Sequence, residues 1–160
     1  MKRGSTFFLQ GVVVFLGLAT LAICVFALPE IWKGSSEEYP TASHAISLIV
    51  IGLYVTAIPF FIALWQALKL LRYIKENKAF SDLSVRALRT SKRCWTVIAV
   101  LYLGGVPLLI PIAHADDAPG LLPIGLIIAL APVAVAVFAA VLERLLQSGM
   151  DLKSENELTV

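Results

Sequence analysis

Charged side chains are scarce in this sequence, and four long stretches have none. Only 15% of the 160 residues are Asp, Glu, Lys or Arg and 59% are hydrophobic, whereas a soluble domain has about 25% charged and about 45–50% apolar residues. The uncharged stretches cover residues 5–29, 39–68, 94–115 and 118–142. A water-soluble fold of this length cannot bury so much apolar surface, so the composition excludes a soluble globular protein.

Cysteine and histidine are also scarce, with two of each. Cys24 and Cys94 are expected near opposite faces of a hydrocarbon layer about 30 Å thick, whereas a disulfide needs Cα atoms within about 7 Å. The four residues do not have the spacing of a zinc site. No catalytic motif is present, so we expect no catalytic residues, metal or cofactor. A membrane enzyme with another motif is the alternative.

A cation site is conceivable only at one short acidic segment. Asp116 and Asp117 follow His114, and His44 or Glu30 could supply further ligands. Adjacent acids on a short connection are more often solvated turn residues. We therefore predict no metal site.

Each uncharged stretch holds a run close to the 20 or so residues that a helix needs to cross a bilayer. Strands are excluded by length, because they usually run only about 3–10 residues. The predicted fold is all-α, a polytopic membrane protein with one domain over residues 1–160. The predicted transmembrane helices are residues 7–28, 44–71, 94–113 and 121–146.

Basic residues predict the orientation, because Lys and Arg are retained on the cytoplasmic side. Every basic residue except Lys33 falls before the first uncharged stretch, between the second and third, or after the fourth. Both termini are therefore predicted to be cytoplasmic, in a multi-pass protein of the plasma membrane. A cleaved signal peptide is the competing interpretation of residues 1–28, but this apolar run is longer than the usual 7–15 residues.

The cytoplasmic connection, residues 72–93, is the most informative polar segment. Ser81 is predicted to cap a short helix, with Asp82 favourable beside the helix dipole and Phe80 packing on Val85. We expect this helix to lie along the inner membrane surface and lead into the third crossing.

Four cations on this helix form the candidate binding site. Helical spacing puts most of them on one face, which could hold anionic lipid or a cytoplasmic protein. A nucleic-acid site is not supported, because no base-reading module accompanies the charges. The candidate residues are Arg86, Arg89, Lys92 and Arg93.

No ionisable residue lies in the central part of any predicted crossing, which weakens a transporter interpretation. Glu143 and Arg144, at the inner end of the fourth crossing, are expected to reach the lipid headgroups. The polar residues within the spans are expected to hydrogen-bond between helices. They are Tyr54, Thr56, Gln66, Thr96 and Tyr102.

Small residues form a stripe along the fourth crossing, which would let another helix approach closely. Packing within the chain is the simpler interpretation, and homo-oligomerisation is the alternative. The stripe consists of Gly125, Ala129, Val133, Ala136 and Ala140.

Two segments, Asn77–Arg89 and Leu152–Val160, together with the opening residues 1–6, resemble the DUF2975 family of small bacterial membrane proteins over essentially the whole chain. The resemblance implies a bacterial plasma-membrane protein and, as a cytoplasmic partner, a small helix-turn-helix regulator. We predict a non-enzymatic protein that binds or regulates a cytoplasmic partner through its basic inner face. A small transporter or channel subunit is the alternative. The tail, residues 147–160, is hypothesised to fold back, placing Glu155 and Glu157 on Arg86 and Arg89.

Overall fold

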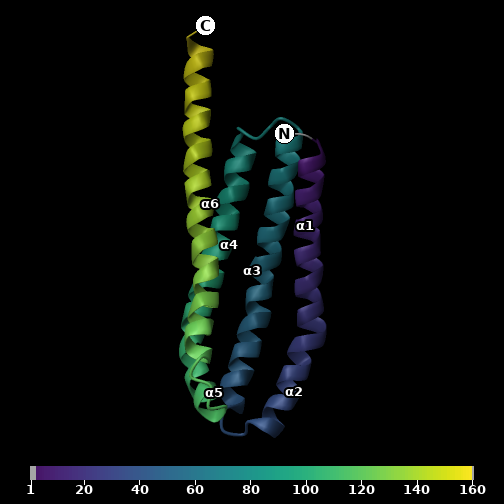
Figure 1. The fold of residues 1–160 in the computed structure, drawn as a ribbon. Helices are drawn as coiled ribbons and strands as arrows, with labels where there is room; N and C mark the ends of the chain where they lie inside the picture. Colours follow the sequence, from purple (N-terminus) through teal and green to yellow (C-terminus); the bar gives the residue numbers. More distant parts are fainter. Residues whose placement is uncertain (1–2, 160) are drawn as a thin grey trace.

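The computed structural model describes residues 3–159, which form helices and short turns with no strand among them (Figure 1). Four of its continuous helical segments are long and apolar enough to cross a membrane, which confirms the predicted all-α membrane fold. The elements are α1 (Arg3–Ala22), the π-helical turn η1 (Ile23–Ala27), α2 (Leu28–Glu38), α3 (Ser43–Lys75), α4 (Asp82–Gly105), the 3₁₀ turn η2 (Val106–Leu108), α5 (Leu109–Ala115) and α6 (Leu121–Leu158).

The four segments lie side by side as a row, in the order α1, α3, α4 and α6, with both chain ends at the same end of the molecule (Figure 1). The extensive contacts join neighbours in this row, since α4 packs on α3 and α6 while α1 and α2 pack on α3. In α1 only Thr6 is buried among the described side chains, and Phe7 and Phe15 are 74% and 69% exposed. The first segment therefore offers most of its surface to lipid.

The helices extend beyond the predicted crossings. The segment that begins with α1 continues past residue 28 to Glu38, and α6 continues past residue 146 to Leu158. The structure does not show the separate short helix expected along the inner surface, because residues 82–93 are the first turns of α4. No proline or glycine interrupts residues 82–103, so the helix starting after Ser81 runs directly into the span.

One hydrogen bond between helices explains how the first segment passes Pro29. The Leu28 N–H bonds to the Ile23 carbonyl in the π-helical turn. The next donor in this pattern would be Pro29, which has no N–H, and the Cys24 carbonyl instead accepts from the Tyr54 hydroxyl at 2.7 Å. Tyr54 thus joins two helices, as predicted.

The other polar residues of the spans do not join helices. Thr56 and Thr96 donate to carbonyls of their own helices, at Leu53 and Lys92. Tyr102 makes no side-chain hydrogen bond within residues 3–159. Gln66 likewise makes no side-chain hydrogen bond in the described chain. The prediction of bonds between helices is therefore wrong for these four residues. A threonine hydroxyl easily reaches the carbonyl one turn earlier, and this local bond competes with distant partners.

Part of the small-residue stripe on α6 packs within the chain. A Cβ atom added at Gly125 would lie 2.1 Å from Leu109 Cδ1, and Ala129 is 2% exposed. At these two positions, the missing side-chain volume lets α6 approach α5 and the end of α4.

Candidate functional site at the basic end of the bundle

We call the end that holds the termini and the α3–α4 turn the basic end, because the predicted binding residues lie there. The turn itself is tightly held. Asn77 has a φ of 57°, in the left-handed region, and Ser81 and Ser84 both donate to the Lys78 carbonyl, at 2.7 and 3.1 Å. The Ser81 hydroxyl also accepts from the Ser84 N–H at 3.4 Å, and Asp82 lies in the first turn of α4. Ser81 and Asp82 thus stand where a helix cap requires them.

The helices remain packed beyond the apolar runs. Leu71, Val85, Ala87 and Leu88 are all at most 8% exposed, and Ser84 is fully buried. These residues belong to α3 and α4, and α6 covers α4. The basic end is consequently a packed platform of three helices, not a loose loop with a surface helix.

Glu143 on α6 is the central charged residue of this platform. It is 6% exposed. Its Oε1 accepts from Arg89 Nε at 2.8 Å and its Oε2 accepts from Lys92 Nζ at 2.5 Å (both on α4). A buried carboxylate requires such partners, because an unpaired one would lose its hydration without compensation. The expectation that Glu143 reaches the lipid headgroups is wrong, whereas Arg144 beside it is exposed.

The four candidate cations therefore divide into two pairs. Arg89 and Lys92 are half-buried against Glu143, with 47% and 34% of their side chains exposed. Arg86 and Arg93 are exposed and form no ion pair within the described chain. The predicted face of arginines is not wholly available to a binding partner, because Arg89 forms an ion pair with Glu143 of α6.

Sequence reasoning missed Glu143 as a site residue. The available signal was a single acid between apolar neighbours, at the end of a span and facing a connection rich in cations. Spacing along one helix cannot reveal such a pair, because the partners are more than 50 positions apart.

Arg86 and Arg89 also line a polar depression of about 460 Å³ between α4 and α6, together with Asp82, Gln147 and Asp151. Its charges have both signs, so this depression is not a simple anion site.

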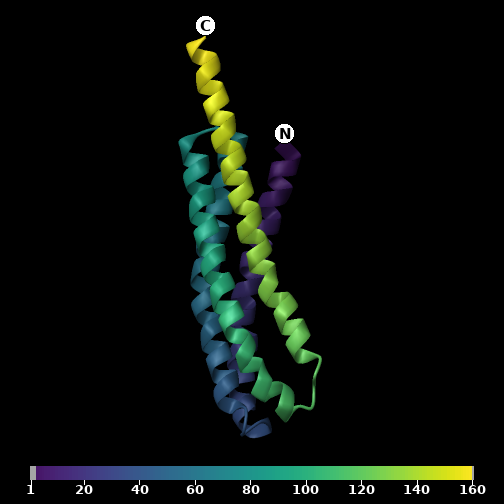
Figure 2. The same ribbon diagram turned by 90° about the vertical axis from the view of Figure 1, so that its left-hand side faces the viewer.

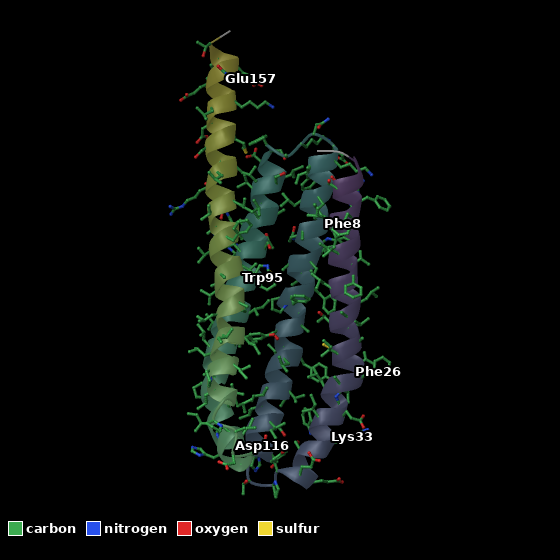
Figure 3. All side chains as sticks on the ribbon, in the orientation of Figure 1. Phe8, Phe26, Lys33, Trp95, Asp116 and Glu157 are labelled. Atoms are coloured by element: carbon green, nitrogen blue, oxygen red, sulfur yellow. The ribbon has the colours of Figure 1, made fainter. Side chains whose placement is uncertain are left out.

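The tail does not fold back onto the arginines. Residues 151–158 continue α6 as an exposed helix that projects past the α3–α4 turn, with Glu157 near its tip (Figure 1 and Figure 3). Just before this exposed part, α6 packs closely on the turn, because a Cβ added at Gly149 would lie 2.7 Å from Phe80 Cε1. The hypothesised pairs of Glu155 and Glu157 with the arginines are absent from the described residues, and α6 keeps its backbone hydrogen bonds instead.

The opposite end of the bundle carries the acidic segments, and Lys33 and Asp116 both lie near it (Figure 3). The Tyr39 hydroxyl donates to Asp116 Oδ1 at 2.8 Å, and this hydrogen bond, with the negative charge beside it, raises the pKa of Tyr39. Within residues 3–159 no three His, Cys, Asp or Glu side chains gather as metal ligands would. The structure thus does not bring His44 or Glu30 to the aspartates as a metal site.

Four membrane-length helices, alternating in direction so that α1 begins and α6 ends toward the same end of the bundle (Figure 2), define a multi-pass membrane protein. Residues 30–160 match the family called "Protein of unknown function (DUF2975)", and the chain belongs to this family. It is similar to the "Uncharacterized membrane protein YoaS" of Bacillus subtilis (strain 168), with 50% identity over 160 residues that include all of both chains. No solved structure matches the chain.

Proposed function

We propose that this protein is a non-enzymatic membrane receptor whose basic end faces the cytoplasm and binds an acidic surface of a cytoplasmic protein. The observation that carries the proposal is the division of the cations. Glu143 pairs with both Arg89 and Lys92, so among the described residues Arg86 and Arg93 remain as exposed, unpaired charges on a rigid support. A fixed, exposed charge suits recognition, because little conformational freedom is lost on binding.

Distance along α4 separates lipid contact from protein contact. Arg93 directly precedes Cys94, where the third apolar run begins, and is well placed for lipid phosphates. Arg86 lies eight residues earlier, which corresponds to about 12 Å of helix. The headgroup layer is only about 5–8 Å thick on each side. Arg86 therefore lies beyond the headgroups, where a protein partner can reach it.

The partner class follows from the chemistry of this surface and from the family resemblance. Exposed arginines recognise carboxylates by paired hydrogen bonds, so the partner's contact surface should be acidic. A small helix-turn-helix regulator with such a surface is the candidate, and binding would hold it at the membrane.

The test compares two single substitutions that remove the same charge from α4. Crosslinked cells expressing wild type, Arg86→Gln or Arg89→Gln are solubilised in mild detergent, and the captured proteins are quantified. Arg86→Gln should lower partner capture several-fold without changing thermal stability, because Arg86 has no partner in the described chain. Arg89→Gln should lower thermal stability, because Glu143 then loses a partner. Unchanged capture with Arg86→Gln would contradict the proposal.

The transporter alternative gains no support from the space between the spans. A transporter needs a polar path, whereas the cavity between α3, α4 and α6 is lined almost entirely by apolar residues.

A further inference from the structure

A cavity of about 540 Å³ lies within the membrane-spanning part of the bundle, between α3, the α4–η2–α5 segment and α6. Glycines leave room on two of the walls, at Gly52 and at Gly104 and Gly105, whereas Gly125 on the third wall packs on Leu109. A Cβ added at Gly52 or Gly104 would have no neighbour within 4 Å. The volume is within the range of about 300–1,000 Å³ typical of small-molecule sites, which often lie between the helices of bundles.

The cavity extends from Tyr102 toward the acidic end of the spans, where Leu48 and Leu121 line it. The depth of its inner part restricts what can reach Tyr102. Tyr102 on its wall lies eight residues after Cys94, or about 12 Å along the span. This position is near the middle of a hydrocarbon layer about 30 Å thick. A molecule at this depth comes from the bilayer, because water and ions are excluded there.

Tyr102 supplies a hydroxyl to the wall of the cavity. Its hydroxyl has no hydrogen-bond partner in the part of the chain that the structure describes. Tyr54, in contrast, donates to the Cys24 carbonyl at 2.7 Å. An unpaired hydroxyl in an apolar environment costs about 1–3 kcal/mol. An occupant with a hydrogen-bond acceptor would remove that cost.

We propose that this cavity binds a neutral, elongated apolar molecule from the bilayer that carries a carbonyl oxygen, and that this oxygen accepts a hydrogen bond from Tyr102. A phospholipid does not meet this description. Its charged headgroup stays at the membrane surface, so its chain would present only CH₂ and CH₃ groups to Tyr102. The second hydroxyl of the wall, Thr56, already donates to the Leu53 carbonyl, which leaves Tyr102 as the donor.

The test uses an alkyl benzophenone, a neutral molecule whose ketone is both the hydrogen-bond acceptor and the photoreactive group. Protein in phospholipid vesicles is titrated with this probe and irradiated, and labelled peptides are quantified by mass spectrometry. Wild type should show saturable labelling of peptides from the walls of the cavity. Tyr102→Phe keeps the cavity and removes the donor, so the probe concentration for half-saturation should rise about five- to tenfold.

A second set of variants in the same labelling experiment fills the cavity with larger side chains. Gly104→Leu should abolish saturable labelling, and Gly52→Leu tests the same point from the opposite wall. Gly11→Leu is the matched control, because Gly11 also has open space at its Cβ but is not part of the cavity wall; its labelling should equal that of wild type. A thermal unfolding measurement in detergent confirms that each variant is folded, and a misfolded glycine variant leaves Tyr102→Phe as the deciding comparison.

Equal half-saturation in Tyr102→Phe and wild type would overturn the proposal and indicate an ordinary acyl chain in the cavity. Unchanged saturable labelling in both filled variants would show that the probe binds elsewhere.

Discussion

The contact of Glu143 with Arg89 and Lys92 should show a pronounced asymmetry when its two sides are removed separately. Glu143 is 6% exposed, whereas the side chains of Arg89 and Lys92 are 47% and 34% exposed. In Glu143→Leu the two cations can turn outward to water and lipid phosphate. We expect this substitution to lower the free energy of unfolding by only about 1–2 kcal/mol.

The reverse substitution removes the partners of the buried group. In the double variant Arg89→Met with Lys92→Met, the Glu143 carboxylate stays between α4 and α6 without a cation. Breaking a buried pair in this way costs about 3–5 kcal/mol. The triple variant, with Leu at position 143 as well, replaces the ionic contact by an apolar one of similar volume. It should be within about 1 kcal/mol of wild type.

The assay is reversible unfolding in mixed detergent micelles, followed by tryptophan fluorescence. The double variant and Glu143→Leu, compared with the triple variant, form a cycle whose coupling energy should be about 4–7 kcal/mol, the sum of the two separate costs when the triple variant is close to wild type. Arg93→Met controls for the loss of a cation near the membrane surface. Because Arg93 is exposed and makes no ion pair within residues 3–159, it should change stability by no more than about 0.5 kcal/mol. Equal costs for the two sides, or additive costs in the triple variant, would refute the asymmetry argument.

Three further predictions concern tyrosine hydroxyls. Tyr54→Phe leaves the Cys24 carbonyl without its donor and should lower stability by about 0.6–1.7 kcal/mol in the same assay; Tyr102→Phe, whose hydroxyl has no partner in the described chain, should not lower stability when no ligand is present. The Tyr39 hydroxyl donates to Asp116, and the pKa of Tyr39 is raised. The hydrogen bond therefore stabilises the folded state fully at pH values below the ordinary tyrosine pKa of about 10. This contribution disappears as the pH rises through the raised pKa. Asp116→Asn should shift the tyrosinate absorbance titration to lower pH, and an unchanged titration would show that this bond does not form in solution.

The sequence by itself determined the class of fold. Four apolar runs of membrane length leave few alternatives, because a backbone in hydrocarbon must satisfy its own hydrogen bonds and does so within single helices. The start of α4 was also predictable, since Ser81 and Asp82 provide local signals that act within one turn.

The lengths of the helices were less predictable. Hydropathy marks where a helix leaves the hydrocarbon but not where it stops being helical. Residues 82–93 and 147–158 therefore continue α4 and α6 beyond the apolar runs. Packing with neighbouring helices supports residues 82–93, whereas residues 151–158 are helical although they are exposed.

Tertiary structure alone decided the partners across helices. Glu143 could have pointed to lipid, and its burial against Arg89 and Lys92 depends on the rotation of α6 relative to α4. The same holds for Tyr54, which meets the carbonyl that Pro29 leaves free, and for the cavity at Tyr102. Periodicity fixes which residues share a face of one helix, but the face that meets a neighbour is set by the fit of side chains from all the helices together.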